Sequence, residues 1–286
     1  MEIVDIFVII IACIISYLLG SVSIARLITK KESDGGIKSQ GSGNPGTMNM
    51  LRTHGVFMGL FTLLCDALKG TIPALFALLY FKHYDPVIQY SCIFGFGLSA
   101  VLGHIFPCFY RFKGGKGIAT TFGIFIVVDP ITTVILFGIL FLTLYFIKIG
   151  SVVSLLFITI VAVVQLFKGF MDANWLSIML MFIIVLIDYW AHRQNLFRLM
   201  DNKENPADLQ EGLKKDIEKI KNKRERKLEK NAVRHDKITR KYDRKIDKRS
   251  DKVQRKIDKI NRSTNNADTN EKNTIEDNKE ENSANE

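Results

Sequence analysis

The feature that most limits the possible folds of this chain is the uneven distribution of charge along it. The first 200 residues contain 14 Lys or Arg and nine Asp or Glu, whereas the last 86 contain 25 and 20. A soluble globular domain would intersperse apolar and charged residues along its whole length. The chain therefore divides into an apolar part suited to a membrane and a highly charged tail.

The apolar part contains seven separate apolar stretches. They are residues 3–27, 56–81, 87–106, 117–128, 131–147, 152–167 and 175–190. An α-helix needs about 20 residues to cross the hydrocarbon core of a bilayer. Several stretches are shorter than this, 117–128 most clearly, so we expect an all-α bundle of about seven transmembrane helices, some of them tilted or re-entrant. The first stretch has no basic residues before it and no cleavage site after it, which favours a span over a signal peptide.

Basic residues alternate between the connectors of these stretches. They concentrate after the first, third, fifth and seventh stretches, whereas the other connectors carry Asp85, Asp129 and Asp172. The positive-inside rule then places the N-terminus outside and the C-terminus in the cytoplasm. The four cysteines lie in or beside apolar stretches, so they do not indicate a disulfide framework.

The first polar motif follows the first stretch, on the predicted cytoplasmic side. Its glycines would let backbone N–H groups approach an anion closely, and its Ser and Asn side chains add donors. A flexible loop of the same composition is an equally good interpretation of this motif taken alone. The candidate binding residues are Gly41, Ser42, Gly43, Asn44, Gly46 and Asn49, followed by Arg52.

The second motif is a Gly-Gly-Lys-Gly run that precedes an apolar stretch. It would combine backbone N–H groups, a helix N-terminus and a lysine, which suits a phosphate group. It is not a Walker A loop, because Tyr110 replaces the first glycine and Gly117 replaces the Ser or Thr. The alternative is a basic membrane anchor. The candidate residues are His104, Lys113, Gly114, Gly115, Lys116 and Gly117.

The third motif lies at the end of the last apolar stretch. His192, Asn195 and Arg198 are spaced three residues apart, so neighbours in this series share a helix face. An interfacial cap of the helix is the alternative. Within the second stretch, Asp66 and Lys69 are expected to pair with each other, because an isolated charge at membrane depth is costly. No metal-ligand cluster and no Ser/His/Asp triad is indicated, so we predict no metal and no cofactor.

These motifs resemble those of a known family, the bacterial integral-membrane acyl-phosphate:glycerol-3-phosphate acyltransferases. Residues 103–120 are similar to the second motif of that family throughout, 41–52 to its first, and 192–204 to its third. The resemblance covers about residues 1–205. The sequence departs from the family pattern at Thr47-Met48, where Ala-Thr is usual, and Met48 cannot donate a hydrogen bond.

The resemblance implies transfer of a fatty acyl group from acyl phosphate to the 1-hydroxyl of sn-glycerol 3-phosphate. The active site would face the cytoplasm at the bacterial cell membrane, and no cofactor would be needed. We expect Asn195, His192 and Ser42 to be catalytic, and the other motif residues to bind phosphate. A transporter or flippase for an anionic lipid or phosphorylated metabolite is the alternative. It predicts binding sites at the membrane midplane, whereas these motifs cluster on one face.

The tail has no counterpart in the family core. We predict a charged helix over 206–262 and a disordered end over 263–286. Contact with anionic lipid and self-association are possible functions, as is a solvated helix without a partner; a specific nucleic acid is not indicated. Because 207–286 contains none of the motifs, its removal is expected to leave activity intact.

Overall fold

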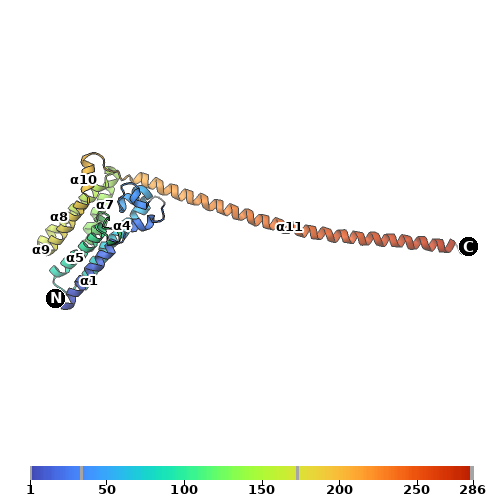
Figure 1. The fold of residues 1–286 in the computed structure, drawn as a ribbon, viewed down its shortest axis with the longest axis horizontal. Coiled ribbons are helices and arrows are strands. Elements are labelled where there is room, and N and C mark those ends of the chain that lie inside the picture. Colours follow the sequence, from blue (N-terminus) through green and yellow to red (C-terminus); the bar gives the residue numbers. More distant parts are fainter. Residues whose placement is uncertain (1, 33–34, 172–173, 284–286) are drawn as a thin grey trace. The chain divides into compact units, whose positions relative to one another are not determined.

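The structure is a computed structural model that describes residues 2–32, 35–171 and 174–283. All secondary-structure elements in these ranges are helices, which confirms the all-α prediction. The elements are α1 (Ile3–Ser21), α2 (Ile24–Thr29), η1 (Gly36–Ser39), α3 (Thr47–His54), α4 (Val56–Tyr80), α5 (Pro86–Ile105), η2 (Cys108–Tyr110), α6 (Ile118–Val128), α7 (Pro130–Ile147), α8 (Gly150–Met171), α9 (Trp175–Ala191), α10 (Arg193–Met200) and α11 (Leu209–Ser283). Figure 1 shows α1, α5, α8 and α9 in one bundle.

The seven apolar stretches all form helices, but they differ in length. Within the described residues, five helices or bent helices are long and apolar enough to cross a bilayer, and α9 with α10, bent by 50°, gives a sixth. Helix α6 has only 11 residues and rises about 16 Å. It ends because Pro130 starts α7, whose first turn is capped by the Asp129 side chain.

Close backbone contacts hold the bundle together. A Cβ at Gly70 of α4 would overlap the carbonyl of Thr120 in α6, and a Cβ at Gly123 of α6 would overlap that of Ala67 in α4. Small residues at these crossings let the two helices approach closely, as is common in membrane bundles. This packing fixes the start of α6 against α4, where the second motif lies.

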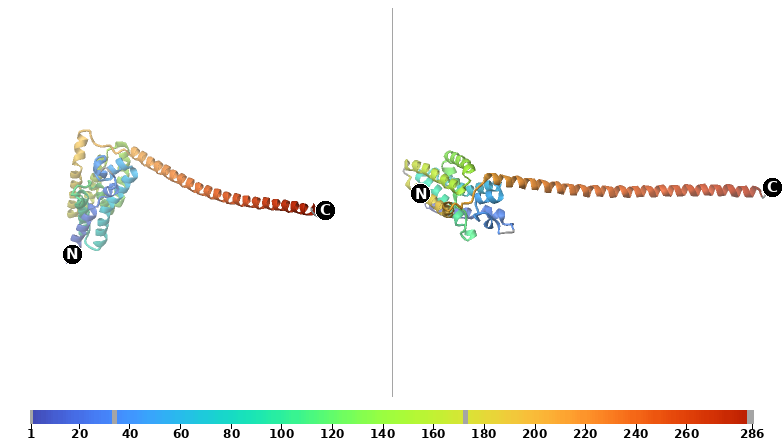
Figure 2. Two further views of the ribbon diagram at one scale, coloured as in Figure 1. Left: turned by 45° about the vertical axis from the view of Figure 1, so that its right-hand side comes forward. Right: turned by 90° about the horizontal axis from the view of Figure 1, so that it is seen from above.

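The connectors gather at the two ends of the bundle as the charge pattern predicts. At one end, Tyr84 donates a hydrogen bond to Asp5 (2.8 Å), and Lys168 pairs with Asp129 (2.5 Å). At the opposite end, Arg26 donates to the carbonyl of Lys113. In the left view of Figure 2, the N-terminus and α10 lie at opposite ends of the bundle. The three polar motifs therefore share one end.

The C-terminal helix contributes to two compact units. Its first turns, up to Lys219, belong to the membrane unit, and the rest of the helix, from Ile220, forms the second unit. The membrane unit thus extends past the boundary at 205 expected from the sequence. Helix α11 continues to Ser283, and no Gly or Pro follows Gly212 within it. The disorder expected over 263–286 stays a prediction. Residues 284–286 lie outside the described residues.

Candidate active site

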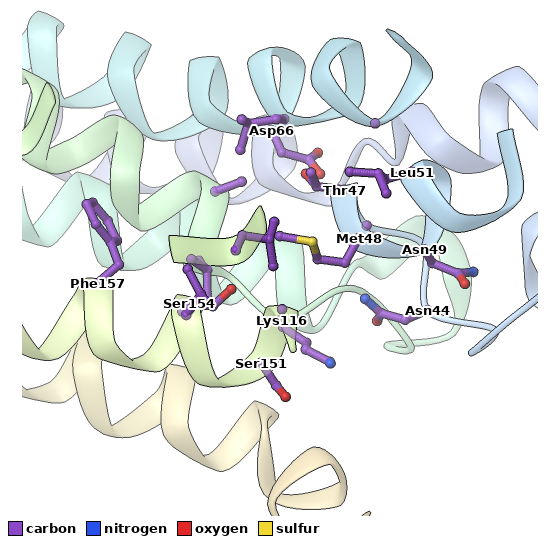
Figure 3. A pocket seen from close by; sticks show the side chains of 18 of the residues that line it. Asn44, Thr47, Met48, Asn49, Leu51, Asp66, Lys116, Ser151, Ser154 and Phe157 are labelled. Atoms are coloured by element: carbon purple, nitrogen blue, oxygen red, sulfur yellow. The ribbon is translucent and has the colours of Figure 1, made fainter. Parts of the chain in front are cut away.

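A cavity with one polar and one apolar end lies among α3, α4, α6, α7 and α8, next to the α9–α10 bend. The space between atoms in the cavity and its open mouth is about 1140 Å³. The apolar end is lined by Leu60, Leu63, Phe122, Phe137, Leu140 and Phe157. At the polar end, side chains from all three motifs meet, including Asn44 and Lys116, and Ser151 of α8 joins them (Figure 3).

Two helix N-termini border the polar end of the cavity. Gly46 and Thr47 at the start of α3 line it, as do Gly117 and Ile118 at the start of α6. The first N–H groups of a helix have no partner within it and carry partial positive charge. Two such ends beside one cavity favour a phosphate group.

The first motif provides fewer free N–H groups than expected. The N–H of Ser42 donates to Oδ1 of Asn49 (2.9 Å), that of Gly43 to the carbonyl of Gln40 (2.9 Å), and that of Gly46 to the carbonyl of Asn44 (2.9 Å). The Asn49 amide also donates to Gln40 (2.9 Å), so this side chain holds the loop together. The start of α3 and the side chains of Ser42 and Asn44 are the donors of this motif that line the cavity.

The second motif divides between scaffold and cavity. The N–H groups of Gly114 and Gly115 donate to the carbonyls of Ile105 and His104 (both 3.0 Å), which closes the turn after α5. Neither glycine lines the cavity, and Lys113 is exposed. His104, Lys116 and Gly117 do line it. Gly117 has a φ of 92°, which a residue with a side chain rarely adopts.

Lys116 is the cation in the cavity that has no partner. It makes no hydrogen bond or ion pair with any residue that the structure describes, although it lines the polar end. Its pKa is lowered to about 8, chiefly by burial and also by the positive charges of Arg198 and Arg52, with Glu204 acting in the opposite direction. A phosphate would compensate this charge and supply the missing acceptor.

His192 presents one ring nitrogen to the cavity. Its Nδ1 lies 2.8 Å from the carbonyl oxygen of Asp188, and a carbonyl can only accept, so Nδ1 carries the proton. In the neutral ring, Nε2 then has a free lone pair. His192 is only 3% exposed and lines the cavity, so Nε2 can bind a hydroxyl group or, when protonated, a phosphate oxygen.

A carboxylate organises the rest of the third motif. Glu204 accepts hydrogen bonds from Nδ2 of Asn195 (2.5 Å), Nε of Arg198 (3.0 Å) and the hydroxyl of Ser151 (3.1 Å). Burial raises the pKa of Glu204, but these hydrogen bonds outweigh it and lower the pKa overall. Arg198 is therefore neutralised and lies outside the cavity lining, whereas Oδ1 of Asn195 is buried and has no partner among the described residues.

Glu204 lines the cavity, but the sequence analysis did not assign it to the site. It lies in the irregular segment after α10, and its side chain is 3% exposed. Its position in the third motif of the family was the available signal. The buried carboxylate of Glu204 lies beside two arginines and Lys116. It partly compensates their positive charge, which would be costly to bury when no substrate is bound.

Arg52 is oriented by the segment after Glu204. Its Nε donates to the carbonyl of Pro206 (2.6 Å) and its Nη2 to that of Asn205 (2.8 Å), while the side chain lines the cavity. That segment is itself tied down, because the N–H of Ala207 donates to the carbonyl of Lys148 (2.6 Å). The side chain of Lys148 also pairs with Asp208 (2.7 Å).

The first turns of α11 hold the ends of α3 and α4. Lys215 and Lys219 donate to the carbonyls of Arg52 (2.5 Å) and His54 (2.8 Å) at the C-terminus of α3. Asp216 accepts from the N–H of Phe57 in the first turn of α4 (3.0 Å). A helix C-terminus favours positive charge and a helix N-terminus favours negative charge, so the lysines suit the end of α3 and Asp216 suits the start of α4. The segment 205–219, called the clasp below, therefore belongs to the structure around Arg52.

A second charged cluster contributes Asp66 and His104 to the cavity lining. Lys69 and Asp66 form the expected ion pair, with 2.6 Å between Nζ and Oδ1, and both side chains are buried. Nδ1 of His104 lies 3.7 Å from the same carboxylate oxygen. A Cβ at Gly115 would overlap the His104 ring, so the Gly-Gly turn packs against this cluster. The ion pair thereby connects α4 to the second motif.

The comparisons with known proteins agree with this geometry. A family model described as glycerol-3-phosphate acyltransferase matches residues 10–202. The chain belongs to this family. It is 36% identical to glycerol-3-phosphate acyltransferase 2 of Bacillus anthracis over 196 residues, which cover 68% of this chain and 97% of that protein. It is 38% identical to the glycerol-3-phosphate acyltransferase of Geotalea daltonii over 191 residues, 66% of this chain and 93% of the relative.

Solved structures of the same family are also similar. They are crystal structures of PlsY (YgiH), an integral membrane glycerol 3-phosphate acyltransferase. Its glycerol 3-phosphate form has a TM-score of 0.62 at 30% identity and covers 69% of this chain and 94% of its own. Its lysophosphatidic acid form has a TM-score of 0.61 at 29% identity and covers 72% and 98%. The chain is therefore an integral membrane protein of the glycerol-3-phosphate acyltransferase family, to which a charged C-terminal helix is added.

Proposed function

We propose that this chain transfers a fatty acyl group from acyl phosphate to the 1-hydroxyl of sn-glycerol 3-phosphate, releasing inorganic phosphate. The observation that supports this best is the cavity, which joins an apolar end to a polar end with one unpaired lysine and two helix N-termini. Acyl phosphate has the same division into an apolar chain and a phosphate, and glycerol 3-phosphate adds a second small anion.

The residues supply charge and orientation rather than a covalent nucleophile. Acyl phosphate is a mixed anhydride with a good leaving group, so positioning and stabilisation of the developing negative charge suffice for transfer. Lys116, Arg52, Ser42 and the two helix N-termini would bind the phosphates. Oδ1 of Asn195 would accept a hydrogen bond from the attacking hydroxyl, and His192 in its protonated form would donate from Nε2 to the second anion. A substrate phosphate oxygen would take the proton from the hydroxyl.

The donor is tested by offering three acyl donors to the purified protein. Glycerol 3-phosphate would be incubated with acyl phosphate, acyl-CoA or acyl-carrier protein of the same chain length, and 1-acylglycerol 3-phosphate would be measured. We expect product from acyl phosphate alone, with phosphate released in equal amount. Turnover of acyl-CoA at a comparable rate would contradict the proposed donor, and transport of either phosphate compound without acylation would favour a transporter.

Lys116 predicts a pH dependence. Because its pKa is lowered to about 8, the ammonium loses its proton as the pH rises through 8, and phosphate binding weakens with it. We expect kcat/KM for a phosphate substrate to be at its maximum below pH 8 and to fall about ten-fold per pH unit well above it. In Lys116→Arg the side chain stays protonated, so this decline should disappear even if the maximum is lower. An unchanged decline in the variant would assign it to another group.

We also propose that the polar end of the cavity faces the cytoplasm. The alternation of basic connectors supports this orientation. Lys31 and Lys82 are both exposed and lie in connectors at opposite ends of the bundle. In intact cells, a membrane-impermeant thiol reagent should label Lys82→Cys and not Lys31→Cys, in a background without native cysteines. Labelling of Lys31→Cys alone would reverse the orientation.

A further inference from the structure

Helix α11 carries a narrow apolar stripe over the part that belongs to the second unit. The stripe comprises Leu228, Ile238, Tyr242, Ile246, Val253 and Ile257. At about 3.6 residues per turn these positions fall on one side of the helix. Each side chain is between 44% and 63% exposed. A helix whose apolar stripe is exposed along several turns indicates a missing partner.

Charge is arranged asymmetrically around this stripe. A lysine precedes, and an acidic residue follows, the apolar residue at four places: Lys227-Leu228-Glu229, Lys241-Tyr242-Asp243, Lys245-Ile246-Asp247 and Lys256-Ile257-Asp258. Because neighbouring residues on a helix are about 100° apart, all four lysines lie on one flank of the stripe and all four acids on the other. The two flanks are therefore opposite in charge along the helix.

The pattern also repeats along the helix. The pentapeptide Arg-Lys-Ile-Asp-Lys occurs at 244–248 and again at 255–259, a spacing of 11 residues. Eleven residues make just over three whole turns, so the repeat keeps the stripe and its flanks in register along a helix. Such a repeat suits long contact between helices.

We infer that the stripe is a dimerisation surface, and that its partner is the same helix of a second copy, packed in parallel. In a parallel pair of these helices, the lysine flank of one helix faces the acidic flank of the other, so each lysine lies near an acid. In an antiparallel pair, the lysine flanks would face each other and repel. Each copy is held in the membrane by residues 1–219, so two copies start α11 at the same membrane face, which favours a parallel pair.

The acidic flank is the reason to favour a second copy over a lipid surface. Between residues 221 and 260 the helix has 18 Lys or Arg and seven Asp or Glu, an excess that would attract an anionic bilayer. However, a helix lying on a bilayer presents both flanks of its apolar stripe to the headgroups. Four of the seven acids follow stripe residues directly and would face the anionic headgroups. In the parallel pair the same acids have cationic partners.

Cysteine crosslinking in the full-length protein tests this pairing. Leu228→Cys and Ile257→Cys place a thiol on the stripe, and the matched controls Arg226→Cys and Arg255→Cys place one on the opposite face two residues earlier. The four native cysteines would be replaced by alanine, and membranes would be oxidised with copper phenanthroline. We expect covalent dimer at 228 and at 257, several-fold more than at 226 and 255. An antiparallel pair cannot crosslink equal positions at both ends of the stripe.

A charge exchange separates self-association from other partners. The double variant Lys241→Glu, Lys245→Glu makes both flanks acidic at these positions, so crosslinking at Ile257→Cys should fall several-fold. Adding Asp243→Lys and Asp247→Lys gives the two flanks opposite charges again, with the signs exchanged. Crosslinking should then be restored. Crosslinking in neutral detergent should match that in membranes. If 228 and 257 crosslink no more than their controls, the inference is overturned. Burial of the stripe only in vesicles with anionic lipid would then identify a lipid surface as the partner.

Discussion

Replacing Asn195 with alanine is expected to lower kcat about 100-fold. The buried Oδ1 of Asn195 has no partner among the described residues and lies at the cavity, where it can accept a hydrogen bond from the attacking hydroxyl. Its Nδ2 is fixed by Glu204 at 2.5 Å, so the amide is held in one orientation. Steady-state kinetics with both substrates varied would measure the effect.

The matched control for this change is the neighbouring Gln194→Ala. Gln194 is exposed and does not line the cavity, so its replacement removes an amide from the same helix without touching the site. Activity of this control should stay within two-fold of the unaltered protein, a rough allowance for an exposed position. Equal losses in the two variants would show that α10 acts only as a scaffold, and the catalytic assignment of Asn195 would be wrong.

Truncation within the clasp is expected to have the second largest effect. A chain that ends at Lys219 keeps every contact of the clasp, and we expect it to retain full activity. The sequence alone led to the expectation that removal of 207–286 leaves activity intact, and the contacts of the clasp change that expectation. A chain that ends at Pro206 loses the tether from Ala207 to Lys148 and the charges at the ends of α3 and α4. Arg52 then loses the fixed carbonyls that orient it, so kcat/KM for a phosphate substrate should fall about ten-fold, less than the full value of one charged hydrogen bond.

Point variants separate this effect from a folding defect. Lys215→Ala, Asp216→Ala and Lys219→Ala together remove the side-chain contacts of the clasp in the full-length chain. The same number of changes in the second unit, Lys245→Ala, Asp247→Ala and Lys248→Ala, serves as the control. The first set should raise KM for a phosphate substrate with normal membrane insertion, and the second should not. Loss of activity on truncation at Lys219 would show that the second unit, not the clasp, is required.

Much of the fold could be predicted because membrane helices leave a strong local signal. Hydropathy and connector charge locate the helices and group the motifs at one end. The ion pair of Asp66 and Lys69 follows from the same reasoning, since charges at this depth need partners. The sequence also predicts that α6 is too short to span, because the apolar stretch 117–128 has too few residues to cross a bilayer.

The site was predicted less completely, because hydrogen bonds between distant segments leave no local pattern. Asn49 and Gly43 belong to the first motif, but nothing in its sequence shows that both donate to the carbonyl of Gln40 instead of to an anion. Glu204 contacts Ser151 and Asn195 across 53 and nine residues. The clasp resembles ordinary charged helix in its sequence, and its role depends on which helix ends lie next to it.

The depth of the cavity has a consequence for where the lipid product is placed. Its polar end lies at one end of the bundle, and Phe157, at its apolar end, is seven residues into α8 from Gly150, about 10 Å along the helix axis. This is roughly a third of the hydrocarbon thickness. A product with its headgroup at the polar end and its chain in this cavity is already aligned with a single leaflet. The reaction would therefore supply one leaflet directly, and balanced growth of the membrane would require a separate lipid-translocating activity.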